Sequence, residues 1–275
     1  MLKQRVITAI FLFLVLIAVF VFSYIPPVVS GFAALLSVLA VWELFHASGL
    51  DLKKPGVLLP LIGAALFALI FPFLPVGFPL VLTEIVFVLA VFAGGFALLK
   101  FGQYSLKNPL ILLPIALIIP VLAGSVVYTR ELDNGLTYLL LMCLSCFATD
   151  TGAYFIGRAF GKRKFSPRIS PNKTVAGFVG GFVANTALHL ITALILRFAC
   201  SLSVSVWGFA LLGLLCGFVD PFGDIVLSAV KRNFGVKDFG RLLPGHGGVL
   251  DRFDSFLFIG PFVYLFISLV NPLYI

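Results

Sequence analysis

Almost the whole chain consists of apolar runs, each about 20 residues long, which is the length that an α-helix needs to cross a bilayer. Short breaks separate these runs, for example at Pro26-Pro27, at Ser48–Pro55 and at Tyr128–Gly135. The residues are 61% hydrophobic and only 11% charged, whereas a soluble domain averages about 25% charged residues. The sequence therefore predicts an all-α, polytopic integral membrane protein.

We expect nine membrane-spanning helices. Their predicted positions are 6–25, 28–47, 57–74, 79–99, 109–128, 136–157, 175–198, 204–230 and 255–273. Helices 1–3 fill residues 1–76, helices 4 and 5 fill 77–135, and the last four helices fill 136–275. The two long polar loops, Arg158–Thr174 and Lys231–Asp254, both lie in this last part, so the function is expected there.

The positive charges predict the orientation of the helices. If the N-terminus is cytoplasmic, 17 of the 19 Lys and Arg residues fall on cytoplasmic segments, and only Arg130 and Arg197 fall outside, as the positive-inside rule requires. Nine spans then put the C-terminus outside and both long loops in the cytoplasm. The net charge of +8 is explained by this topology, so we expect no nucleic acid partner and a place in the cytoplasmic (inner) membrane.

The segment Ser228–Asp254 is a polar exception near the C-terminus. It holds five cations, three carboxylates and a Pro-Gly-His-Gly-Gly turn. Because polar groups are costly next to hydrocarbon, such a cluster in a membrane protein indicates a functional site.

The eighth predicted helix carries a polar stripe, because residues four apart share one helix face. Its members are Asp220, Asp224, Ser228, Lys231 and Arg232. Two carboxylates near cations suit a hard divalent ion such as Mg²⁺; an internal Asp–Lys or Asp–Arg pair that holds helices together is the alternative. We also expect Pro221 and Gly223 to interrupt the helix and to free backbone carbonyls beside the carboxylates.

The Gly-rich turn Pro244–Gly248 predicts a second part of the site, although a plain tight loop is the alternative. Successive N–H groups in such a turn can form a nest for phosphate oxygens, and His246 could donate to a phosphate. Asp251 and Asp254, with Arg252 between them, open the ninth predicted helix. If the loop folds back, Asp251 faces Asp224, and a metal held by both would lie beside the phosphate nest.

The sixth predicted helix and the loop after it form a third polar group. Asp150, Tyr154 and Arg158 are again spaced by four residues, and Ser170–Thr174 resembles a rigid binding segment with hydroxyls, an amide and a cation. Lys162–Lys164 are interpreted as surface charge attracted to anionic lipid. Glu43, Glu84, His46 and His189 are given no role.

Together these motifs resemble the CDP-diacylglycerol synthases, also called phosphatidate cytidylyltransferases. The resemblance covers about residues 145–255. It rests on Asp150–Tyr154, Ser170–Thr174, the pair Gly223-Asp224, and the long signature from Ser228 through Lys231-Arg232, Lys237-Asp238, Gly240 and Leu243–Gly248 to Asp251-Arg252 and Asp254. Two positions depart from the pattern, since Ala176 and Leu227 stand where the family has acids.

The resemblance implies that the protein transfers CMP from CTP to phosphatidate within the membrane, giving CDP-diacylglycerol and pyrophosphate. Asp224 and Asp251 would hold Mg²⁺, supported by Asp220 or Asp254; a second cation, Mg²⁺ or K⁺, and a homodimer are left open. The implied catalytic residues are Asp224, Asp251, Lys231 and Arg232. The implied substrate-binding residues are Ser170, Asn172, Lys173, Ser228, Lys237, Asp238, His246, Gly247, Gly248 and Arg252.

Two other functions stay open. One is a CTP-dependent enzyme that acts on another lipid phosphate or on a polyprenol. The other is a membrane transporter, which buried acids and broken helices would also suit.

Overall fold

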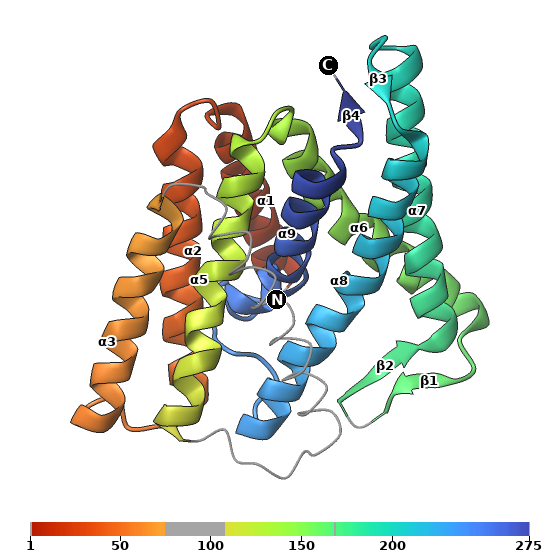
Figure 1. Ribbon diagram of the computed structural model, residues 1–275. Helices are drawn as coiled ribbons and strands as arrows, with labels where there is room; N and C mark the ends of the chain where they lie inside the picture. The colour runs from red at the N-terminus through yellow and green to blue at the C-terminus, as the bar shows by residue number, and fades with distance from the viewer. Residues whose placement is uncertain (1, 75–107, 168, 275) are drawn as a thin grey trace.

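The computed structural model describes residues 2–74, 108–167 and 169–274, and within them the chain is built mainly from long helices (Figure 1). Eight of these helices are long and apolar enough to cross a membrane. They are α1 (Leu2–Val21), α2 (Pro26–Ala47), α3 (Pro55–Ile70), α5 (Pro109–Glu131), α6 (Gly135–Phe160), α7 (Val175–Phe198), α8 (Val206–Phe234) and α9 (Leu250–Val270). The prediction of an all-α polytopic membrane protein is confirmed, and the helix expected at 79–99 lies outside the described residues.

Short elements complete the described fold. The 3-10 turn η1 (Phe71–Phe73) extends α3. Two antiparallel strand pairs join β1 (Lys164–Ser166) to β2 (Ser170–Thr174), and β3 (Ser203–Val204) to β4 (Leu273–Tyr274). The binding segment expected at Ser170–Thr174 is therefore a strand, and its last residue caps α7, since Thr174 Oγ1 accepts a hydrogen bond from Gly177 N at 3.0 Å.

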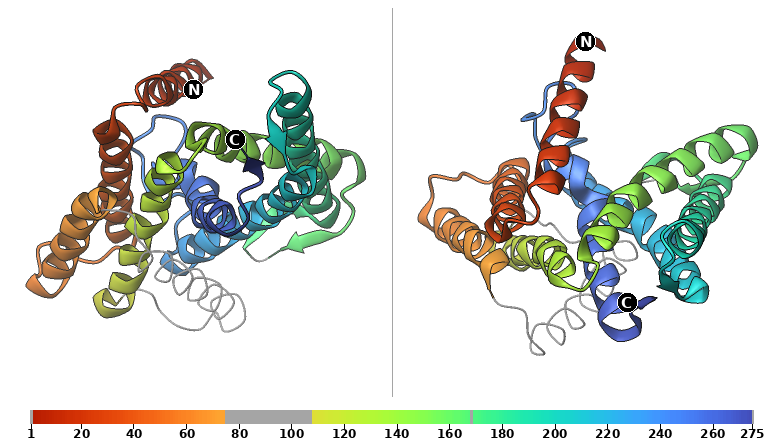
Figure 2. Two further views of the ribbon diagram at one scale, coloured as in Figure 1. Left: turned by 45° about the horizontal axis from the view of Figure 1, so that its top comes forward. Right: turned by 90° about the horizontal axis from the view of Figure 1, so that it is seen from above.

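The helices form two groups that meet at α9. In the first, α2 packs against α3 and α5; in the second, α6, α7 and α8 pack in chain order, and α9 contacts both α5 and α8. Figure 2 shows the two groups diverging when the molecule is seen from above, with α1 extending away from both. The α6–α7 contact is close because a Cβ on Gly180 would lie 2.8 Å from Gly152 O, and small residues let membrane helices approach in this way.

Hydrogen bonds show which segments lie together at each end of the described helices. Thr8 near the N-terminus donates a hydrogen bond to Pro244 O, and Arg232 donates one to Ile169 O, so the N-terminus and both long loops gather at one end. At the other end, Ser205 N donates to Pro272 O, next to the β3–β4 pair. Which side of a membrane each end faces stays a prediction.

The expected break in the eighth helix is wrong. Helix α8 runs without interruption from Val206 to Phe234, with Pro221 inside it. A proline in a helix removes one hydrogen bond, and neighbouring helices and side chains can compensate for that loss in a membrane protein. Lys173 Nζ lies 3.4 Å from Pro221 O, a contact that connects β2 to this turn of α8 but does not replace the hydrogen bond that the proline removes.

Candidate functional site

The first centre of the site is an ion pair between β2 and α8. Lys173 Nζ lies 2.6 Å from Asp224 Oδ2, and Ser228 Oγ donates to Asp224 Oδ1 at 3.1 Å. The hydrogen bond between Ser228 and Asp224 follows from their spacing of one helical turn. The strand therefore brings a cation to the polar stripe of α8, and the stripe itself is formed as the sequence predicts.

The second centre is a buried ion pair between α8 and the first turn of α9. Lys231 Nζ donates to Asp251 Oδ1 at 2.9 Å, and the two side chains are 10% and 2% exposed. The other oxygen, Asp251 Oδ2, accepts hydrogen bonds from Phe239 N at 2.8 Å and Gly248 N at 2.9 Å. A buried carboxylate with three donors organises the loop as well as carrying charge.

The Gly-rich turn is shaped by two glycines with positive φ, Gly245 at 79° and Gly247 at 92°. Leu243 N donates to Gly247 O, and His246 N donates to Leu243 O, which closes the turn. Gly247 has a second reason to lack a side chain, because a Cβ there would lie 3.1 Å from Asp251 Oδ2. The N–H groups of His246 and Gly248 thus point to protein acceptors, so the predicted phosphate nest is not formed from them in this structure.

Glu43 on α2 is a functional candidate that the sequence analysis missed. Its side chain is fully buried, and its two carboxylate oxygens accept hydrogen bonds from Val249 N and Leu250 N, each at 2.9 Å. These N–H groups belong to the start of α9, where negative charge is stabilised by the helix dipole. Glu43 therefore holds the N-terminal end of α9, and with it Asp251, from the other helix group.

Glycines next to this carboxylate make the contact possible. A Cβ on Gly248 would lie 2.6 Å from Glu43 Cδ, and one on Gly240 would lie 2.8 Å from the same atom. No local pattern around residue 43 indicates this role; the glycines of the distant loop are the only sequence signal.

Two cavities meet at the acids of α6 and α8. The larger, of about 610 Å³, opens beside α1, α6, α8 and α9. The predicted site residues that line it are Asp224, Lys231, Asp238, His246, Asp251, Arg252 and Asp254. The smaller, of about 520 Å³, lies under the β1–β2 pair and is lined by Asn172, Lys173 and Asp220 among the predicted residues. Asp150 borders both cavities, so it is a further candidate that was noted in the sequence but given no role.

The remaining predicted residues lie around these cavities. Arg232 joins the end of α8 to the β1–β2 turn and to the loop, through Ile169 O at 3.3 Å and Val236 O at 3.0 Å. Lys237 is exposed on the loop, and Ser170 is half-buried at the start of β2. Arg158 and Tyr154 interact as their spacing predicts, with Arg158 Nη1 donating to Tyr154 Oη at 3.0 Å.

The carboxylates around the larger cavity suit a divalent cation in their chemistry. Asp224, Asp251 and Asp254 all line it, and Asp220 Oδ2 is buried without a hydrogen-bond partner in the described structure. Oxygen ligands of this kind are those that Mg²⁺ prefers. In this structure Asp224 and Asp251 form ion pairs with lysines. Among the described residues, no group of three or more His, Cys, Asp or Glu side chains is arranged to bind a metal ion.

The two positions that depart from the family pattern differ in their surroundings. Leu227 is 6% exposed and belongs to the hydrophobic core, where an unpaired carboxylate would be strongly destabilising. Ala176 is half-buried in the first turn of α7. The leucine is thus consistent with its position in the core, and Ala176 has no structural explanation.

Comparison with known proteins gives a consistent result. The sequence profile described as the cytidylyltransferase family matches residues 3–270. A phosphatidate cytidylyltransferase of Bacillus subtilis is 48% identical over 143 residues, which is 52% of each chain. A protein of the same name from Staphylococcus haemolyticus is 44% identical over 138 residues, which is 50% of this chain and 52% of that relative. The matched stretch thus spans about half the length of these curated relatives.

Proposed function

This chain belongs to the cytidylyltransferase family, and on that premise we propose that it transfers CMP from CTP to phosphatidate, forming CDP-diacylglycerol and releasing pyrophosphate. The observation that carries this proposal is the arrangement of two Lys–Asp pairs, Lys173–Asp224 and Lys231–Asp251. Two anionic substrates must meet in this reaction, and each pair holds a cation that can turn to a phosphate.

The chemistry needs little more than positioning and charge neutralisation. A phosphate oxygen of phosphatidate is already a nucleophile, so no strong general base is required. It attacks the α-phosphorus of CTP, a new P–O bond forms, and the bond from that phosphorus to the β-phosphate bridging oxygen breaks. Pyrophosphate leaves with the electron pair. Lys173, Lys231 and Arg252 neutralise the phosphate charge, and preorganised cations of this kind stabilise such a transition state.

We propose that Asp224 and Asp251 hold Mg²⁺, with Asp220 or Asp254 in support. When bound, the ion would neutralise the triphosphate and stabilise the pyrophosphate leaving group. Lys173 and Lys231 now occupy these carboxylates, so a divalent ion would release both ammonium groups toward the substrate phosphates. The unpartnered Oδ2 of Asp220 supports an additional oxygen ligand.

The site is proposed to face the cytoplasm, where CTP is present, in the cytoplasmic membrane. The positive-inside charge distribution supports this side, together with the gathering of the N-terminus and both long loops at one end. CTP would enter from the loop end and phosphatidate from the bilayer.

Labelled CTP tests this function directly. Purified protein in lipid or detergent should incorporate the label from CTP into lipid when phosphatidate and Mg²⁺ are present, with pyrophosphate released in equal amount. Polyprenyl phosphate and polyprenol, offered in parallel, should give no labelled product. Absence of labelled lipid with phosphatidate, or faster labelling of another lipid, would refute the proposed reaction.

A further inference from the structure

The lining of the larger cavity combines charged and apolar side chains. Lys231, Asp251 and Arg252 contribute polar groups to its lining, and apolar side chains of α1, α6 and α9 contribute the rest. The apolar residues of α1 are Ala9, Leu12, Phe13 and Leu16. Their spacing of three and four residues places them on one face of the helix. One cavity thus contacts both cations and an apolar cleft, which is the part of the cavity beside these residues of α1.

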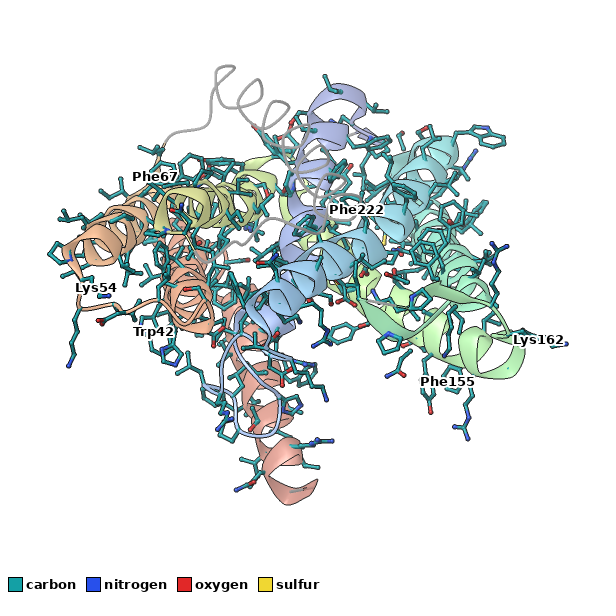
Figure 3. The ribbon with its side chains drawn as sticks, turned by 90° about the horizontal axis from the view of Figure 1, so that it is seen from below. Trp42, Lys54, Phe67, Phe155, Lys162 and Phe222 are labelled. Atoms are coloured by element: carbon teal, nitrogen blue, oxygen red, sulfur yellow. The ribbon has the colours of Figure 1, made fainter. Side chains whose placement is uncertain are left out.

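Helix α1 is bound loosely to the rest of the described protein. It extends away from the two helix groups (Figure 2). Its apolar side chains are exposed on several faces, with Phe13 beside the cavity at 61% and Phe11 and Leu14 elsewhere at 59% and 57%. One anchor lies near its N-terminal end, where Thr8 Oγ1 donates to Pro244 O at 3.0 Å. Figure 3 shows the loop between α8 and α9 lying across α1 in this region. The helix is therefore fixed to the active-site loop while its apolar face borders the cleft.

We infer that this cleft holds an acyl chain of the lipid substrate, with α1 as its outer wall. The inference rests on the proposed function, because it assigns a place to one half of phosphatidate. With the phosphate at Lys231 and Arg252, the acyl chains would extend from these cations along the apolar part of the cavity lining. Leu12 and Leu16 on α1 face that route, and Phe147 on α6 borders it from the other side.

An acyl chain fits this cleft better than a protein segment or the nucleotide. The cleft lies between membrane-spanning helices, since α1, α6 and α9 all have the length and apolarity of spans. A chain that moves from the bilayer into such a cleft exchanges one apolar surrounding for another. Binding strength is then set mainly by the phosphate, and the cleft determines how the chain is placed and how well its length fits.

Matched tryptophan variants test the inference. Leu12→Trp and Leu16→Trp add bulk inside the cleft, whereas Leu14→Trp makes the same change on the face that points away from it. Overfilling a packed site typically weakens it, so the KM for dioleoyl phosphatidate should rise about tenfold in the first two variants. The KM for a short-chain phosphatidate, such as the dihexanoyl lipid, should change less than about twofold, because short chains reach little of the cleft.

A second measurement uses the unmodified protein. Phosphatidate with a photoactivatable group at the end of one acyl chain should crosslink to the peptide containing residues 9–16, and excess dioleoyl phosphatidate should prevent this labelling. Equal behaviour of Leu12→Trp and Leu14→Trp, or labelling that avoids α1, would overturn the inference. Failure of the unmodified protein to convert either phosphatidate would instead refute the proposed function.

Discussion

The two helix groups of this protein are similarly apolar but use their acids differently. In the described part of α6–α9, Asp150, Asp220, Asp224, Asp251 and Asp254 surround two cavities. In the group of α2, α3 and α5, Glu43 is the buried acid of the described residues, and its hydrogen bonds go to the other group. The group of α2, α3 and α5 therefore supports, through Glu43, the site that α6–α9 form.

Removal of a site carboxylate should have the largest effect. We expect Asp224→Asn and Asp251→Asn each to reduce Mg²⁺-dependent turnover at least about 10³-fold, since loss of a transition-state electrostatic partner costs on this order. Asp51→Asn, an exposed acid after α2, is the matched control and should keep full activity. Turnover is measured with labelled CTP. Near-normal turnover of either site variant would remove the metal assignment.

Loss of the carboxylate of Glu43 should lower both activity and stability from a distance. Glu43→Ala leaves two buried N–H groups of α9 without acceptors, at a cost of about 1–3 kcal/mol for each. Glu43→Gln keeps one good acceptor and should lose less. We expect faster hydrogen exchange at Val249 and Leu250 and a lower kcat in Glu43→Ala. Glu131→Gln, which changes an exposed acid at the end of α5, is the control and should change neither exchange nor kcat. If Glu43→Ala exchanged at the same rates as the unmodified protein, the two helix groups would be independent.

Substitution of Lys231 should weaken CTP binding more than substitution of Lys53. Lys231→Ala removes a cation that lines the larger cavity, so the KM for CTP should rise about tenfold, as expected for one charged hydrogen bond. Lys53→Ala, on the exposed turn after α2, is the control. Steady-state kinetics at saturating phosphatidate measures both. An unchanged KM for CTP in Lys231→Ala would remove its proposed role.

Glycine substitutions should give the smallest effects, and their effects on stability test how closely the helices pack in each group. A Cβ on Gly180 would meet Ile156 Cγ1 at 2.7 Å and Gly152 O at 2.8 Å, whereas one on Gly63 of α3 meets nothing within 4 Å. Gly180→Ala should therefore destabilise the protein by about 1–3 kcal/mol. Gly63→Ala should stabilise it by up to about 1 kcal/mol through helix propensity. Thermal unfolding in detergent measures both, and equal midpoints would contradict the difference in packing.

The helices could be predicted from the sequence because membrane spans are determined locally, by about 20 consecutive apolar residues. The polar stripe of α8 was also predictable, because its members are one turn apart. The partner of Asp224 was not, since Lys173 reaches it only after β2 folds against α8. The effect of Pro221 was misjudged, because a long membrane helix can continue past a proline although one of its hydrogen bonds is lost.

The hydrogen-bond partners of Glu43 are the part of the structure that could least be predicted from the sequence. It is separated by 206 residues from the first amide that it binds, and an isolated acid in an apolar run gives no indication of such a partner. The loop glycines Gly240 and Gly248 could be recognised as close-approach positions, but nothing in the sequence names the group that approaches them.

The contact of Glu43 with the start of α9 also has a consequence for the synthesis and membrane insertion of the protein. Helix α2 is synthesised well before α9. The carboxylate of Glu43 therefore lacks its hydrogen-bond donors in the nascent chain until α9, the last described helix, has been inserted. A chain released before that point lacks the partner of Glu43 as well as Asp251, so truncated products should be inert rather than partly active. The site can therefore form only after α9 has been synthesised and inserted.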